Sequence, residues 1–86
     1  MTEKEIQLLG FEMQTDEGDE GCAPWHYYTY QVSDGLDFIT CASDETVDDQ
    51  WWVEFFDTTP AIRFHKFAEM QALINLLERH VIVREP

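Results

Sequence analysis

The chain of 86 residues carries 18 Asp and Glu against five Lys and Arg, which gives a formal net charge of -13. An anionic protein repels phosphate backbones and anionic lipid surfaces, so we expect no direct nucleic-acid binding and no membrane attachment. Six Phe, three Trp and three Tyr supply enough apolar area for a folded core rather than a disordered chain. We expect a single domain, residues 1–86, with little room for an internal active site.

The start of the sequence and its cysteines bear on location. Residues 1–5 have neither the basic start nor the apolar core of a signal peptide, and no apolar run is long enough for a spanning helix. We therefore predict a cytoplasmic protein, in which Cys22 and Cys41 are free thiols because the compartment is reducing. A disulfide between them is not expected.

A short helix is predicted first, over about residues 3–9. Thr2 and Glu5 have the spacing of a capping box, in which each side chain caps a backbone N–H of the other. Gly10 stands where a left-handed residue ends a helix. Residues 11–14 then alternate apolar and polar, which is typical of a strand, and residues 15–24 form an acidic loop.

An aromatic hairpin follows over residues 25–41. Asp34 and Gly35 lie between two strand-like runs, which predicts a tight two-residue turn. That turn sets Tyr30 opposite Ile39 and Tyr28 opposite Cys41. The predicted core face is Tyr28, Tyr30, Val32, Ile39 and Cys41, and the predicted opposite face is Tyr27, Thr29, Gln31, Phe38 and Thr40.

The second half of the chain begins with another acidic loop, residues 42–50. Residues 51–56 form the next strand, with Trp51, Val53 and Phe55 on its buried face. After a turn at 57–60, residues 61–64 form a short last strand. Helical spacing then takes over, with a buried stripe that contains Phe67, Met70, Leu73, Ile74, Leu77 and Val81. Residues 81–83 fit either the helix or an extended tail.

The predicted fold class is therefore α+β. A meander of four to five antiparallel strands packs on one C-terminal helix, after a short N-terminal helix.

Catalysis and metal binding find little support in the residue pattern. The candidate zinc ligands Cys22, His26, Cys41, His65 and His80 lack paired ligand spacing, and residues from Asp16 onward fail the EF-hand pattern. No nucleophile motif is present. We expect no enzyme activity, no cofactor and no specific metal site, although weak divalent-cation binding by the acidic loops stays open.

The strongest functional feature of the sequence is electrostatic. Eight of the acids lie in the two loops, and a plain meander brings both loops to the end of the sheet opposite Asp34 and Gly35. Carboxylates there would face a basic protein surface, with nearby aromatic side chains as apolar contacts. The predicted partner-binding residues are Asp16, Glu17, Asp19, Glu20, Trp25, Asp44, Glu45, Asp48, Asp49 and Trp52.

The layout of four segments carries a resemblance. Residues 8–12, the hairpin 25–41, residues 51–56 and the closing segment 73–79 are arranged as in small acidic proteins of bacterial phages and mobile elements, which this chain resembles. The resemblance implies an inhibitor, either a DNA mimic or a protein like the immunity proteins that cap basic toxins. The alternative is a structural or assembly protein, a homo-oligomer that associates through its aromatic sheet face.

Overall fold

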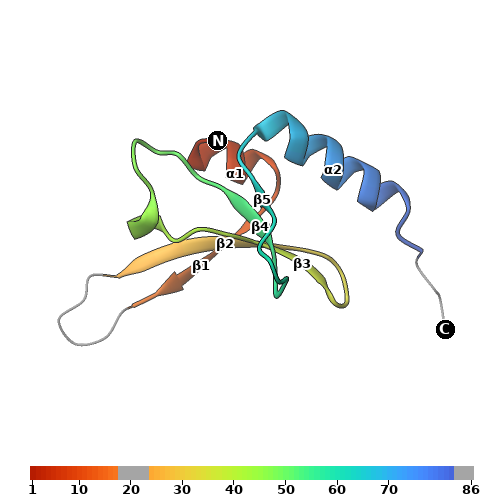
Figure 1. Cartoon of the computed structure of the whole chain (residues 1–86), viewed down its shortest axis with the longest axis horizontal. Coiled ribbons are helices and arrows are strands. Elements are labelled where there is room, and N and C mark those ends of the chain that lie inside the picture. Colours follow the sequence, from red (N-terminus) through yellow and green to blue (C-terminus); the bar gives the residue numbers. More distant parts are fainter. Residues whose placement is uncertain (18–23, 83–86) are drawn as a thin grey trace.

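A computed structural model describes residues 1–17 and 24–82. The described chain contains the short helix α1 (Glu3–Leu8), the strands β1 (Glu12–Asp16), β2 (Trp25–Ser33) and β3 (Leu36–Thr40), the 3-10 turn η1 (Ser43–Glu45), the strands β4 (Val53–Phe55) and β5 (Arg63–Phe64), and the helix α2 (Phe67–Arg79). The strands form one antiparallel sheet in the order β1-β2-β3-β4-β5, so the predicted meander is confirmed. Both helices lie on the same side of the sheet (Figure 1).

The first helix begins and ends as predicted. The Thr2 hydroxyl accepts a hydrogen bond from the Glu5 backbone N–H at 3.2 Å, and the Glu5 carboxylate accepts one from the Thr2 N–H at 2.9 Å. Gly10 has a φ of +94°, which a residue without a Cβ adopts at little cost. Ile6 points from α1 into the core and is fully buried.

The hairpin turn is also where predicted, but the register beyond it is not. Ser33 pairs with Leu36 around Asp34 and Gly35, as expected. A bulge at Val32 then shifts the pairing by one residue, so that Tyr30 lies opposite Phe38. Because side chains alternate along a strand, this shift exchanges the two faces of β3.

The prediction for the faces of β3 was therefore wrong. Phe38 and Thr40, not Ile39, share the core face with Tyr28. The observed register buries the larger side chain: Phe38 is fully buried, and its ring centroid lies 4.8 Å from that of Phe55. Cys41 follows the end of β3 and is buried as expected.

The second half of the chain follows the predicted order. Trp51 and Val53 are buried in the face that the helices cover, and Phe55 is half-buried beside them. Helix α2 contributes Met70 and Ile74 to the same core. The buried apolar residues of the described chain are Met1, Ile6, Phe11, Tyr28, Phe38, Cys41, Trp51, Val53, Met70 and Ile74.

The predicted helix stripe ends before Val81. The His80 N–H donates to the Leu77 carbonyl at the end of α2, and Val81 and Ile82 follow as an exposed, non-helical segment. In the described part of the chain, no helix combines the length and the apolar character needed to cross a membrane.

Candidate functional site

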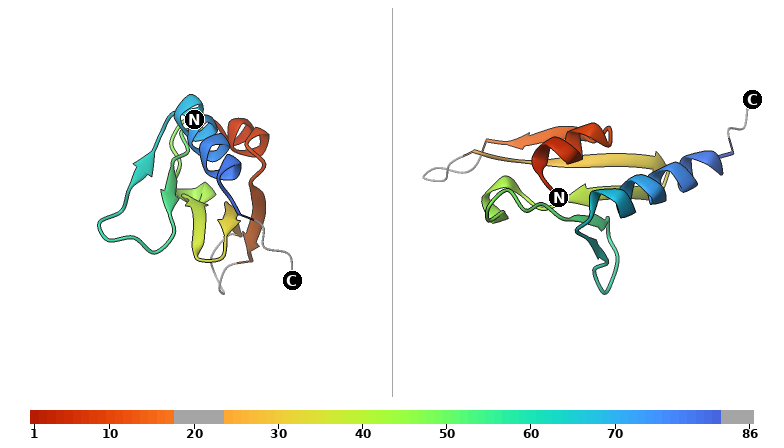
Figure 2. Two further views of the ribbon diagram at one scale, coloured as in Figure 1. Left: turned by 90° about the vertical axis from the view of Figure 1, so that its right-hand side faces the viewer. Right: turned by 90° about the horizontal axis from the view of Figure 1, so that it is seen from above.

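The strand ends that bound the two acidic connections lie at the same end of the sheet. In the observed meander, the segment between β1 and β2 and the segment between β3 and β4 both leave the end opposite Asp34 and Gly35. The backbone N–H of His26, near the start of β2, donates to the Ser43 hydroxyl in η1 at 3.0 Å. Seen from above in Figure 2, η1 lies beside the ends of β1 and β2.

Six of the eight predicted loop carboxylates belong to the described residues, and all six are exposed. We call them the acidic end: Asp16, Glu17, Asp44, Glu45, Asp48 and Asp49. The other two, Asp19 and Glu20, lie outside the described residues.

Two carboxylates of the acidic end stabilise the conformation of the segment between β3 and β4 through hydrogen bonds. Asp49 Oδ1 accepts from the Trp51 indole N–H at 2.9 Å and from the Glu3 backbone N–H at 3.2 Å. Glu45 Oε1 accepts from the Ala42 backbone N–H at 3.1 Å. These carboxylates have structural roles that the sequence pattern did not reveal.

Two others point only to solvent. The side chains of Asp44 and Asp48 make no hydrogen bond or ion pair with residues 1–17 or 24–82. Asp48 also has a φ of +54°, a region that Asp and Asn tolerate better than most residues. Asp44, Asp48 and the exposed Glu17 are therefore carboxylates of the acidic end that a partner can meet without loss of bonds within the described residues.

The two predicted aromatic contact residues differ in their surroundings. Trp25 is half-buried and lies on the sheet face that the helices leave open, with its ring 5.5 Å from that of Tyr27. Trp52 donates its indole N–H to Glu54 at 3.2 Å and lies under the Arg63 guanidinium, 4.9 Å from the ring centroid. Arg63 Nε also donates to Glu54 at 2.6 Å. Trp52 is thus held by Glu54 and Arg63, which share the open face with Ile39, whereas no side-chain hydrogen bond holds Trp25 in the described part of the chain.

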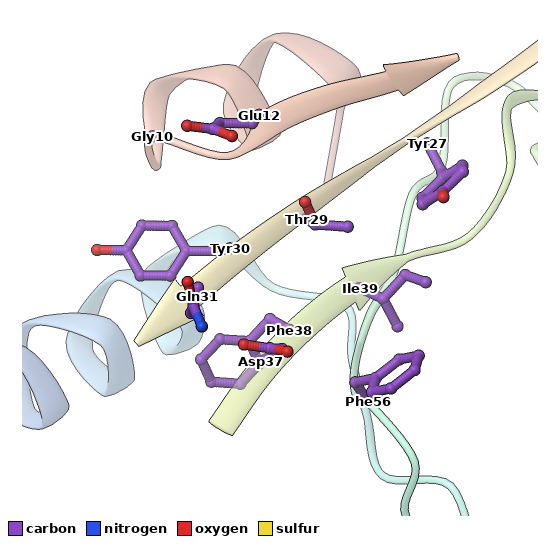
Figure 3. Close-up of a pocket in the computed structure, with 10 residues that line it drawn as sticks. All are labelled: Gly10, Glu12, Tyr27, Thr29, Tyr30, Gln31, Asp37, Phe38, Ile39 and Phe56. Carbon is purple, nitrogen blue, oxygen red and sulfur yellow. The ribbon is translucent and has the colours of Figure 1, made fainter. Parts of the chain in front are cut away.

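A groove of about 660 Å³ lies on this open face and was missed by the sequence analysis. Strand pairing places Thr29 beside Ile39 and Glu12, and Gln31 beside Asp37. Figure 3 shows Tyr27, Ile39 and Phe56 on the same side of the hairpin. We call it the open-face groove, and the residues that line it include Glu12, Tyr27, Thr29, Asp37, Ile39 and Phe56.

The open-face groove is aromatic and acidic. Phe56 is 59% exposed, Tyr27 is half-buried, and Glu12 is exposed. Asp37 is half-buried, and its Oδ1 atom is buried without a hydrogen-bond partner in the described part of the chain. Among the residues of β1–β5 only Arg63 is a Lys or Arg, and Glu54 neutralises it. The negative charge of the groove is therefore not balanced by the sheet.

A polar cluster on the covered face attaches α1 to the sheet. The Tyr28 hydroxyl donates to Glu3 Oε2 at 2.8 Å and accepts from the Gln7 amide at 2.9 Å. His26 Nε2 lies 2.6 Å from the same Glu3 oxygen, within hydrogen-bond distance. Burial raises the pKa of Tyr28 above its ordinary value, although the Gln7 hydrogen bond lowers it in part.

Among the described residues, the candidate zinc ligands do not come together to form a metal site. His26 is bonded to Glu3, and Cys41 is a buried free thiol whose pKa is raised mainly by burial. Cys22 lies outside the described residues. Within residues 1–17 and 24–82, no group of three or more His, Cys, Asp or Glu side chains is placed to hold a metal ion.

The comparisons with known proteins add no relative to this geometry. No protein-family model matches the chain, and neither a curated protein nor a solved structure matches it. The function proposed below rests on the residues of this chain alone.

Proposed function

We propose that this protein is a small interaction module that binds a basic protein surface through its acidic end. The observation that carries the proposal is the meander topology, because it brings two acidic connections from distant parts of the sequence to one end of the sheet. Asp44 and Asp48 are the solvent-facing carboxylates that we assign to the partner, and Trp25 is the adjacent apolar contact. In this proposal the protein acts by binding and not by catalysis.

The charge of the molecule supports such a role. A net charge of -13 on a chain this small creates a long-range field that attracts a cationic surface and orients it during approach. Electrostatic steering of this kind speeds association and makes it sensitive to salt.

The biological form that we propose is an inhibitor that covers a basic protein, either as a DNA mimic or in the manner of an immunity protein. A phage or mobile-element origin and a cytoplasmic location belong to the same proposal. The buried thiol of Cys41 fits a reducing compartment.

Self-association through the sheet face is the competing function. Face-to-face pairing of two copies would bring Glu12 and Asp37 of each copy near the same groups of the other, in molecules that each carry -13. Like charges without counter-charges oppose such an interface. The charge therefore favours a cationic partner over a second copy.

The test uses two variants that change the net charge equally. In one, Asp44→Asn and Asp48→Asn neutralise the acidic end. In the matched control, Asp57→Asn and Glu69→Gln neutralise exposed carboxylates in the β4–β5 turn and in α2. Asn suits the positive φ of both Asp48 and Asp57. Proteins captured from a bacterial lysate at low salt are identified, and the association rate of the purified partner is measured over a salt series.

We expect the first variant to associate more slowly and with a weaker salt dependence than the control variant. Equal rates for the two variants would mean that only net charge matters, and the acidic end would be rejected as the binding site.

A further inference from the structure

We infer that the open-face groove binds the guanidinium group of an arginine side chain from the basic partner. This inference rests on the proposed function, which it deepens by naming a second site and the side chain that enters it. Trp25 lies between the groove and the acidic end, because it pairs with Asp16 of the acidic end and its ring lies 5.5 Å from that of Tyr27, which lines the groove.

The groove offers the two kinds of group that a guanidinium prefers. Guanidinium is planar and weakly hydrated, stacks on aromatic rings and donates several hydrogen bonds to carboxylates. Tyr27 and Phe56 supply the rings, while Glu12 and Asp37 supply the carboxylates. Ile39 provides an apolar wall for the aliphatic stem of the arginine.

The same sheet already holds one arginine in this way. Arg63 lies over the Trp52 ring at 4.9 Å and donates to the Glu54 carboxylate at 2.6 Å. The groove presents the same combination of ring and carboxylate on the neighbouring strand, where its lining residue Ile39 pairs with Glu54, but Asp37 Oδ1 accepts no bond from the described residues. Because Asp37 Oδ1 is buried, we propose that the Asp37 side chain turns toward the groove when a partner arginine enters, and the arginine then makes the ring and carboxylate contacts that Arg63 makes within the chain.

Other occupants fit the groove less well. An anionic ligand would meet two carboxylates that no basic side chain of the strands balances. A lysine ammonium is strongly hydrated and cannot stack as a plane against Tyr27 or Phe56. A second copy of the protein would bring further negative charge to the same face.

The test uses a defined probe, the blocked peptide Gly-Arg-Gly-Arg-Gly, and a matched peptide in which citrulline replaces each arginine. The citrulline side chain ends in a planar urea group, which keeps the shape of a guanidinium but carries no charge. Backbone amide shifts of the whole protein are followed by two-dimensional NMR during titration at low salt. We expect the arginine peptide to shift residues around Tyr27, Asp37, Ile39 and Phe56, and the citrulline peptide to shift none of them.

Variants then assign the contacts. Asp37→Asn should weaken binding by about tenfold through loss of a charged hydrogen bond, and Phe56→Leu by about threefold through loss of the ring face. Asp57→Asn is the charge-matched control and should leave the affinity unchanged. If Asp37→Asn disturbs the fold, as judged by amide dispersion, Phe56→Leu decides the assignment, because Phe56 is already largely exposed.

The outcomes separate this inference from the proposed function. Peptide shifts confined to residues 42–50, weakened by Asp44→Asn with Asp48→Asn but not by Phe56→Leu, would reject the groove and leave the acidic end as the binding site. Groove shifts that depend on protein concentration without peptide would show self-association and overturn the inference. Equal shifts with the citrulline peptide would also overturn it, because the charge would then have no role.

Discussion

The hydroxyl of Tyr28 gives the sharpest test of how the first helix is attached to the sheet. It lies under α1, donates to Glu3 and accepts from Gln7, while its ring packs edge-on against Trp51 at 5.7 Å. Replacement of Tyr28 by Phe removes both hydrogen bonds and keeps the ring. Any loss of stability therefore reports on the hydroxyl and not on core packing.

The magnitude follows from the partners. A neutral hydrogen bond contributes about 0.5–1.5 kcal/mol to stability, and one to a charged group about 1.5–3 kcal/mol. Glu3 is part-exposed and Gln7 is exposed, so in the variant water replaces part of the hydrogen bonding that these two side chains lose. We expect Tyr28→Phe to lower the free energy of unfolding by about 1–2 kcal/mol.

The assay is urea unfolding followed by tryptophan fluorescence, with the slope of the transition unchanged if the folded state keeps its compactness. Tyr27→Phe is the matched control, because the Tyr27 hydroxyl makes no hydrogen bond within the described residues; its effect should stay below about 0.5 kcal/mol. In a double-mutant cycle, Tyr28→Phe and Glu3→Gln should couple by at least about 0.5 kcal/mol. Additive effects, or equal effects of the two Tyr→Phe changes, would refute the contact.

Three further outcomes test the core, the charge and the ionisable groups. Ile74→Ala should cost about 2–5 kcal/mol, whereas Leu76→Ala, at a position 51% exposed, should cost clearly less; similar values in urea unfolding would contradict the assigned face of α2. The melting temperature should rise between about 10 and 300 mM sodium chloride, because screening reduces self-repulsion at a net charge of -13, and a fall would contradict net repulsion. Burial raises the pKa of Cys41 above 9.0, and burial together with Glu78 raises the pKa of Tyr30 to about 12 from 10.0. The unfolded chain then loses these protons at lower pH than the folded chain, so stability should fall as the pH rises from about 9 to 12; thermal melts that stay constant over this window would contradict the burial of both groups.

The elements that could be predicted from the sequence are those fixed by residues close together in the chain. Thr2 and Glu5 cap each other three residues apart, and Asp34 with Gly35 closes the hairpin, so neighbouring residues suffice to place α1 and the turn. Likewise, the apolar spacing of Met70 and Ile74 marks the buried face of α2. The strand order also followed, because short connections make neighbours in sequence neighbours in the sheet.

The parts that were missed depend on contacts distant in sequence. The bulge at Val32 gives a register in which the Phe38 ring packs against Phe55 on the neighbouring strand. The rules for hairpin turns consider only the two strands of the hairpin, so they do not include this contact. In the shifted register Ile39, and not the predicted Phe38, lies on the open face and lines the groove. Asp49 was interpreted as a surface charge because its partner Glu3 lies 46 residues away.

The carboxylates of the acidic end differ in whether they hydrogen-bond to the rest of the chain, and this difference affects which of these positions can change during evolution. Asp49 accepts hydrogen bonds from the Trp51 indole and from the Glu3 backbone N–H in α1, so substitutions at this position lower the stability of the fold. The side chains of Asp44 and Asp48 make no hydrogen bond or ion pair among the described residues, so in the proposed function substitutions at these positions change partner binding with little effect on the fold. If the acidic end binds a partner as proposed, position 44 can vary widely, whereas position 48 is limited to residues such as Asn that adopt a positive φ, and binding specificity can change while the fold is kept.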